Sequence, residues 1–250
     1  MSQFPETLKT WRARRRLSQL DLSLEADVST RHISFLETGR AQPSREMIGR
    51  LGDALQMPLD ARNQMLTHAG FAVMYRGRKW DSGEMAPIRK AVELTLANHM
   101  PFPGLALDRL WTIRQMNGSA AWLYGQFGVG IGDSLLDLLM SETLPSAVEN
   151  WPDVARHAAA RLRTESLRQG GVPEFDRVIR HLSSVDEATL TPPEPVVPTV
   201  IRMGENRLSM FATIAQFGTP EDVTLDDLKI ELYFPMDAPS EALLRSMGRD

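Results

Sequence analysis

The sequence predicts an all-α N-terminal domain followed by an α+β domain, in which an antiparallel five-stranded sheet carries helices on one face. Three observations lead to this prediction. Over residues 5–69, apolar residues recur at spacings of three and four, and strand-like alternation is missing. Between residues 104 and 234, short apolar runs stand on both sides of a group of helical segments. The chain has 250 residues, which is enough for two domains of modest size.

The domain boundary is predicted at a linker, residues 75–84, where two glycines stand among charged residues. This places the domains at residues 1–74 and 85–250. The charge changes at the same point: residues 1–80 carry 13 Lys and Arg against 8 Asp and Glu, whereas residues 81–250 carry 15 against 24. A basic first domain joined to an acidic second domain indicates that only the first domain meets a polyanion.

The composition excludes several classes of protein. The chain has no cysteine, which rules out disulfides, thiolate metal sites and thiol nucleophiles. No apolar run approaches the roughly 18 residues that cross a bilayer, and the N-terminus lacks the pattern of a secretion signal. We therefore expect a cytoplasmic protein with no membrane partner.

Two short helices separated by a tight turn are predicted near the N-terminus. Ser18 can cap a helix over residues 19–25, and Ser29 can cap a second helix that ends near Gly39. The stretch from Arg16 to Gly39 resembles the lambda-repressor-like helix-turn-helix of the XRE type. The resemblance implies that the second helix enters the major groove of double-stranded DNA.

The resemblance also indicates which side chains contact DNA. Arg31 can present a fork to guanine, and Gln19 stands where the family holds a phosphate and braces the recognition helix. Asp27 replaces the usual turn glycine, and aspartate tolerates a left-handed backbone better than most residues. The candidate DNA-binding residues are Gln19, Ser29, Thr30, Arg31, Ser34, Phe35 and Arg40.

The first part of the second domain is predicted as a helix, a hairpin and four further helices. Asp108 and Arg109 form a two-residue hairpin connection, and Asn117 caps the helix that follows the hairpin. The predicted helices are 86–99, 118–124, 135–140, 146–169 and 174–182, and the predicted strands are 104–107 and 110–116.

The last part is predicted to add three strands after a proline-rich extended connection, residues 191–198. Their ranges are 197–203, 207–217 and 228–234, and the last strand alternates Ile230, Leu232 and Phe234 against Lys229, Glu231 and Tyr233. The order of two strands, helices and three strands resembles the PAS-type arrangement, which can hold a ligand between the sheet and the helices.

Several segments resemble the MmyB-like ligand-binding domain over about residues 85–245. They are Leu107 to Trp111 with Asn117, the pair Asn150 and Trp151, and Gly218 to Pro235. The resemblance implies a bacterial transcription regulator that binds an apolar, fatty-acid-like small molecule. The candidate ligand-binding residues are Trp111, Trp122, Leu135, Leu139, Asn150, Trp151, His157, Met210, Phe211 and Phe234.

These observations predict a sequence-specific, ligand-responsive regulator that binds a palindromic operator as a homodimer, because one such head covers little DNA. We expect no catalytic residues, no metal and no cofactor, since the histidines lack ligand spacing and residues 128–133 lack the third glycine of a dinucleotide loop. Two alternatives remain. One is an enzyme with a DNA-binding head. The other is a constitutive, partner-docking regulator without a ligand, which a cavity under roughly 100 Å³ favours over one of about 300 to 1,000 Å³.

Overall fold

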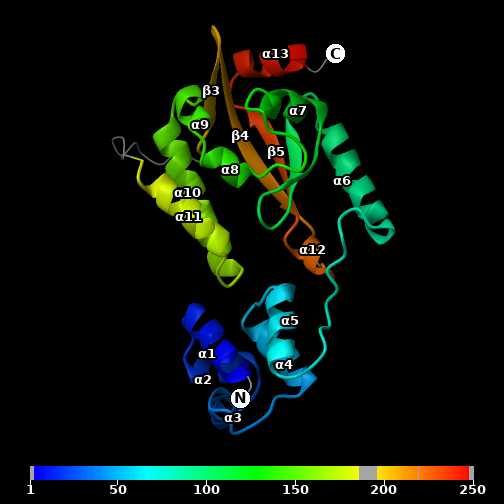
Figure 1. Ribbon diagram of the computed structural model, residues 1–250, viewed down its shortest axis with the longest axis vertical. Coiled ribbons are helices and arrows are strands. Elements are labelled where there is room, and N and C mark those ends of the chain that lie inside the picture. The colour runs from blue at the N-terminus through cyan, green and yellow to red at the C-terminus, as the bar shows by residue number, and fades with distance from the viewer. Residues whose placement is uncertain (1–2, 186–195, 219, 248–250) are drawn as a thin grey trace. The chain divides into compact units, whose positions relative to one another are not determined.

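The protein is described by a computed structural model over residues 3–185, 196–218 and 220–247 (Figure 1). The chain forms two compact units, and their division after Gly77 falls inside the predicted linker. Two segments of the predicted second domain group with the first unit. The first unit contains Met1–Gly77, Thr164–Val172 and Pro220–Asp226, and the second contains Arg78–Arg163, Pro173–Thr219 and Asp227–Asp250.

Five helices build the first unit up to residue 77, so the all-α prediction is confirmed. The apolar positions at spacings of three and four turn inward, and Leu8, Leu22, Ile33, Leu36 and Leu51 are completely buried in one core. The helices are α1 (Phe4–Arg14), α2 (Gln19–Glu25), α3 (Thr30–Glu37), α4 (Arg45–Ala54) and α5 (Leu59–His68).

Side chains cap the N-terminal ends of α2 and α3. The Ser18 hydroxyl accepts from the Asp21 amide at 3.0 Å, and the Asp21 carboxylate accepts from the Ser18 amide at 2.8 Å. Ser29 accepts from the His32 amide at 3.2 Å. Asp27 has a φ of 51°, so the turn uses the left-handed backbone that the sequence predicted there.

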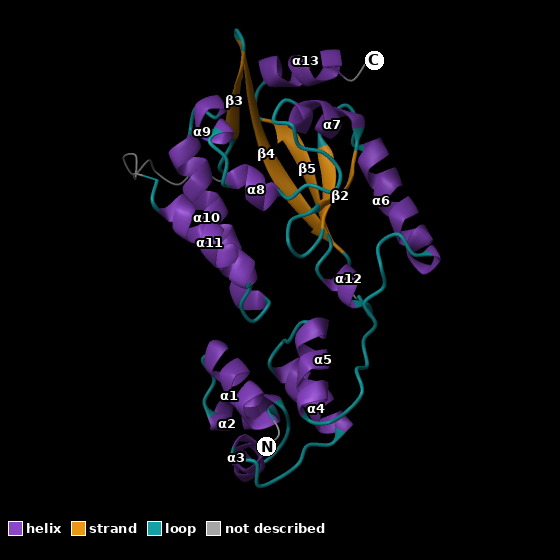
Figure 2. Cartoon of the chain, viewed as in Figure 1, coloured by secondary structure: helices purple, strands orange, loops and turns teal. Residues whose placement is uncertain are grey.

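The second unit contains a five-stranded antiparallel sheet with strand order β2-β1-β5-β4-β3 (Figure 2), which confirms the predicted α+β class. The central strand β5 joins the hairpin β1–β2 to the hairpin β3–β4. The strands are β1 (Gly104–Leu107), β2 (Ile113–Met116), β3 (Thr199–Met203), β4 (Asn206–Gln216) and β5 (Lys229–Pro235).

Besides the predicted helices on one face of this sheet, the end of α6 and α13 contact the other face, and residues 212–216 of β4 are exposed. The ring of His99, just after α6, lies 4.9 Å from that of Phe234, and α13 contacts β4 and β5. The opposite face of β5 meets α7, α8 and α10. The helices after residue 78 are η1 (Gly83–Met85), α6 (Ala86–Asn98), α7 (Gly118–Gly125), α8 (Leu135–Leu139), α9 (Thr143–Ala147), α10 (Trp151–Arg168), α11 (Pro173–Ser183), α12 (Val223–Asp226) and α13 (Ala238–Met247).

Two predicted elements are wrong in detail. The first hairpin has a five-residue connection, because the Asp108 carboxylate accepts from the amides of Leu110 and Thr112 and closes a wider loop. The long helix predicted over 146–169 is two helices, since Val148 leaves the helical path to bridge Ile201. Most of the predicted proline-rich connection lies outside the described residues.

Candidate functional site

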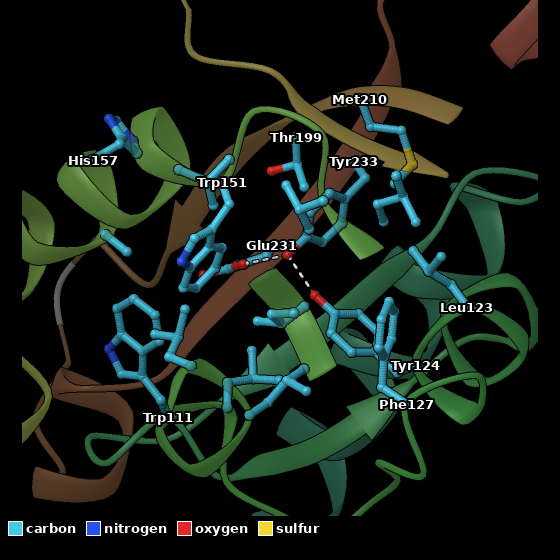
Figure 3. Close-up of a pocket in the computed structure, with 18 of the residues that line it drawn as sticks. Trp111, Leu123, Tyr124, Phe127, Trp151, His157, Thr199, Met210, Glu231 and Tyr233 are labelled. Carbon is cyan, nitrogen blue, oxygen red and sulfur yellow. Dashed lines mark hydrogen bonds between the residues drawn. The ribbon is translucent and has the colours of Figure 1, made fainter. Parts of the chain in front are cut away.

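A cavity of about 160 Å³ lies within the second unit, between the sheet and the helices α7, α8, α9 and α10. Its wall is mostly apolar (Figure 3). The volume falls between the values that the sequence alternatives required, about 100 Å³ for a filled core and about 300 Å³ for a typical ligand pocket. The lining residues are Trp111, Leu123, Tyr124, Phe127, Leu135, Leu138, Leu139, Leu144, Val148, Trp151, Val154, His157, Ala158, Arg161, Thr199, Ile201, Met210, Glu231 and Tyr233.

A buried polar group occupies the part of the wall formed by β5. Glu231 is 3% exposed, and its Oε1 accepts from Arg161 of α10 at 2.5 Å. Its Oε2 accepts from the Tyr233 hydroxyl at 2.9 Å, and the hydroxyls of Tyr233 and Tyr124 are 2.7 Å apart. Figure 3 shows the three oxygen-bearing groups pointing toward one another from β5 and α7.

The direction of this chain of hydrogen bonds follows from the number of protons. Tyr233 has one hydroxyl proton and donates it to Glu231, so Tyr124 must be the donor to Tyr233. Burial, together with the negative charge of Glu231, raises the pKa of both phenols above its usual value, which keeps both hydroxyls protonated. The Tyr124 oxygen is therefore left with lone pairs and no proton to donate.

Aromatic and basic side chains surround the same carboxylate. The Arg161 guanidinium lies 4.3 Å from the centroid of the Trp111 ring, within cation–π range. Trp111 has a φ of 60°, a left-handed backbone that a bulky residue rarely adopts. Burial and the nearby charge of Arg161 both lower the pKa of His157, so its imidazole is neutral at neutral pH. His157 lies at the margin of the group in Figure 3.

Six of the ten predicted ligand-binding residues line this cavity: Trp111, Leu135, Leu139, Trp151, His157 and Met210. Trp122, Asn150, Phe211 and Phe234 do not. Phe234 follows Tyr233 along β5 and so points to the other face of the sheet, where it stacks on Phe211 with ring centroids 5.7 Å apart.

The other two absences also have local causes. Trp122 precedes the cavity residue Leu123 on α7, and adjacent helical residues do not share a face. Asn150 uses its side chain on the backbone before and within β3: its amide donates to the Pro198 carbonyl at 2.8 Å, and its oxygen accepts from the Val200 amide at 3.1 Å.

In the first unit, the predicted DNA-binding residues lie on α3, at its two ends and at the start of α2. Arg31 is exposed and its guanidinium lies 5.2 Å from the Phe35 ring centroid, while Ser34 and Phe35 are half-buried. Thr30 is tied to α2, because its hydroxyl lies 2.9 Å from that of Ser23. Ser29 and Arg40 are exposed on either side of the helix, and Gln19 is half-buried at the start of α2.

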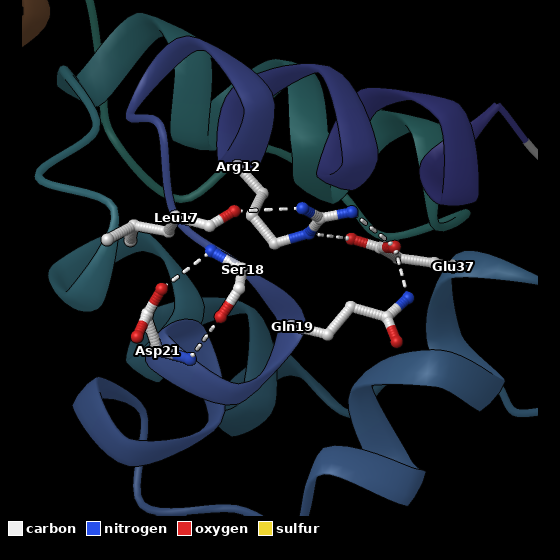
Figure 4. A network of polar contacts seen from close by, with 6 residues as sticks. All are labelled: Arg12, Leu17, Ser18, Gln19, Asp21 and Glu37. Carbon is white, nitrogen blue, oxygen red and sulfur yellow. Dashed lines mark hydrogen bonds and ion pairs between the residues drawn. The ribbon is translucent and has the colours of Figure 1, made fainter.

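The C-terminal end of α3 is held by three N–H donors that meet at one carboxylate (Figure 4). Arg12 binds Glu37 through two nitrogens, at 2.6 and 2.9 Å, and the Gln19 amide adds a third bond at 2.8 Å. Arg12 also donates to the Leu17 carbonyl at 2.9 Å. Helices α1, α2 and α3 are thereby joined through Glu37, and Gln19 supports α3 as the sequence predicted.

The comparison with protein families matches residues 88–247 to the MmyB-like transcription regulator ligand binding domain. The chain belongs to this family. Residues 3–65 match a helix-turn-helix domain, so this MmyB-like protein is a DNA-binding transcription regulator with a ligand-binding domain. Neither matched family is an enzyme family. No curated protein matches the chain.

Sequence reasoning missed the polar wall of the MmyB-like domain. Glu231 and Tyr233 stand on the polar side of the alternating strand, whereas the residue predicted from this strand, Phe234, stands on the apolar side. Arg161 lies among other charged residues of α10. No local sequence pattern indicates that β5 is the central strand of the sheet, where the charged side chains of Lys229 and Glu231 are buried.

Within the described residues, no helix is long and apolar enough to span a membrane, and no three His, Asp or Glu side chains gather as a metal site would require.

Proposed function

We propose that this MmyB-like protein is a sequence-specific transcription regulator that binds DNA through α3 and an apolar small molecule in the cavity. The observation that carries this proposal is the support of α3. Three hydrogen bonds hold Glu37 at the C-terminal end of α3, while Arg31 is exposed near the N-terminal end of the same helix. A helix fixed at one end can present an arginine fork to the edge of a guanine in the major groove.

A homodimer on a palindromic operator in the cytoplasm is part of the proposal. One helix-turn-helix buries little surface on DNA, whereas two heads that read half-sites about 34 to 36 Å apart combine their affinity and specificity. The proposal involves no cofactor.

The apolar lining of the cavity supports ligand binding. Its volume of about 160 Å³ matches the roughly 150 Å³ of an apolar cavity that binds benzene. The family resemblance implies a fatty-acid-like ligand, but such a ligand would require the cavity to enlarge, and the present volume suits a smaller molecule. The alternative is a constitutive regulator whose cavity stays empty, and a small molecule that copurifies with the full-length protein in native mass spectrometry would exclude it.

The DNA-binding half is tested by Arg31→Ala. Duplexes that bind full-length protein are first selected from a random pool, and the affinity of the variant for the selected site is then measured. We expect a loss of about 1 to 3 kcal/mol and a relaxed base preference at one position of each half-site. Arg180→Ala, at an exposed position of α11, is the matched control and should bind as the wild type does. Unchanged affinity and base preference in Arg31→Ala would show that α3 does not read bases.

A further inference from the structure

We propose that the cavity selects a compact, uncharged, ring-sized molecule that carries a hydrogen-bond donor, and that Tyr124, Tyr233 and Glu231 receive this donor. The inference rests on the proposed function, because it specifies the ligand of the same cavity. Size, charge and hydrogen-bond direction support it separately.

The size of the cavity favours a ring over a long chain. About 160 Å³ of space is lined mainly by the side chains of leucine, valine, tryptophan and other apolar residues. A cavity of similar volume holds one benzene ring. An extended acyl chain of a dozen carbons does not fit this volume without displacing part of the wall.

The charge of the wall disfavours an anion. The cation on the wall, Arg161, is already paired with Glu231 at 2.5 Å, and the neighbouring His157 imidazole is neutral at neutral pH. Lys229 is buried near Trp111, but it does not line the cavity. A carboxylate ligand would therefore lose its hydration and meet a second carboxylate, without an uncompensated cation to bind it.

The direction of the hydrogen bonds decides which polar group the ligand carries. Tyr124 donates to Tyr233 and Tyr233 donates to Glu231, so the chain of hydroxyls ends in an acceptor at the Tyr124 oxygen. A phenolic or alcoholic O–H on the ligand completes this chain. A ligand with only acceptor groups does not.

Four probes separate these requirements. The compound p-cresol is neutral and has a hydrogen-bond donor, and p-xylene has the same shape without the donor. The ion p-toluate carries a carboxylate on the same ring, and laurate is a long-chain acid. Titration calorimetry on the full-length protein measures each dissociation constant. We expect p-cresol to bind about tenfold more tightly than p-xylene. We expect p-toluate and laurate to bind more weakly than p-xylene.

Two variants test the residues themselves. In Glu231→Gln, the new amide can donate to Tyr233, so the hydroxyls reverse and Tyr124 becomes a donor, while the wall loses the negative charge of Glu231. Binding of p-toluate relative to p-cresol should then rise at least about tenfold. Glu149→Gln is the matched control, since Glu149 pairs with Arg207 and does not line the cavity.

Tyr124→Phe keeps the ring but moves the end of the chain to the Tyr233 oxygen, so the preference for p-cresol over p-xylene should fall. Tyr75→Phe, outside the cavity, should leave it unchanged. This pair keeps the inference testable if Glu231→Gln does not fold.

Each contrary result has a distinct meaning. Binding of laurate or p-toluate as tight as that of p-cresol would overturn the inference and leave the proposed ligand-binding function intact. Equal affinities for p-cresol and p-xylene would show that the polar wall does not recognise a hydrogen-bond donor on the ligand. If none of the four probes binds the folded protein, the ligand-binding half of the proposed function fails as well.

Discussion

The two units each bury an arginine–glutamate pair to nearly the same extent, but the carboxylates of the two pairs accept hydrogen bonds from different kinds of donor. Arg12 and Glu37 have side chains 16% and 4% exposed, and Arg161 and Glu231 have side chains 19% and 3% exposed. Both oxygens of Glu37 accept only from N–H donors. Glu231 accepts from an arginine on one oxygen and from a hydroxyl on the other.

This difference separates a structural pair from one that can respond to its surroundings. Guanidinium and amide N–H groups cannot reverse their direction, so the bonds around Glu37 have one arrangement and hold α3 in place. A hydroxyl can donate or accept, so the bonds that extend from Glu231 through Tyr233 keep one direction only while Glu231 is a pure acceptor, and they can reverse when a donor takes its place. Burial and pairing distance alone do not distinguish the two roles.

The largest expected effect is that of Glu37→Gln on the stability of α3. In either orientation the amide nitrogen of glutamine would face a nitrogen of Arg12, so two donors would meet and a buried charge would lose its partner. We expect the free energy of opening of α3 to fall by about 3 kcal/mol. Hydrogen exchange of the α3 amides, read by mass spectrometry, measures this quantity directly.

Glu46→Gln is the control for that experiment. Glu46 pairs with Arg50 on the exposed surface of α4, and such a pair contributes less than about 1 kcal/mol. If both variants had the same small effect on α3, the Arg12–Glu37 pair would be as dispensable as a surface pair, and the comparison between the two units would fail.

The same pair gives the opening of α3 a dependence on pH. Burial acts to raise the pKa of Glu37, but the hydrogen bonds from Arg12 and Gln19 and the charge of Arg12 outweigh burial, and the pKa lies below its usual 4.5. A lowered folded pKa means that stability is fully present above about 4.5 and is lost as the pH falls through the folded value. Hydrogen exchange between pH 6 and 3 should show this loss in the wild type. If Glu37→Gln lost as much stability over that range, another carboxylate would be responsible.

Glu231→Gln is expected to have the smallest effect on stability. Because Tyr233 can turn its hydroxyl to accept from the new amide, no pair of donors is forced together, and the cavity has room for water beside Arg161. We expect the free energy of opening of β5 to fall by about 1 kcal/mol, measured by hydrogen exchange with Glu149→Gln as the control. A loss as large as that of Glu37→Gln would mean that the bonds around Glu231 are as rigid as those around Glu37.

The two units also differ in how much of their structure could be predicted from the sequence. The first unit is governed by contacts between residues close in sequence, so Ser18, Ser29 and Asp27 were interpretable from their neighbours alone. The two hairpins of the second unit were also predictable, because each is local, whereas the pairing of β1 with β5 joins distant parts of the chain. Predictions from the local pattern failed where a distant contact decided the structure. Val148 is an example, because helical periodicity gives no indication of its bridge to Ile201.

The cavity was the least predictable part, because its polar wall joins residues far apart in sequence. Arg161 meets Glu231 across 70 positions, and Tyr124 meets Tyr233 across 109. Apolar candidates such as Leu135 and Met210 could be chosen by hydrophobicity, but that criterion also selected Phe211 and Phe234, which face the other side of the sheet. Hydrophobicity predicts that a residue is buried, but it does not predict which neighbours the residue packs against.

Trp111 and Trp151, two of the five tryptophans in the chain, form part of the cavity wall. Their emission depends on the polarity and mobility of what lies beside the indole rings. The protein therefore contains its own optical probe of occupancy, and libraries of small molecules can be screened by fluorescence without attaching a dye.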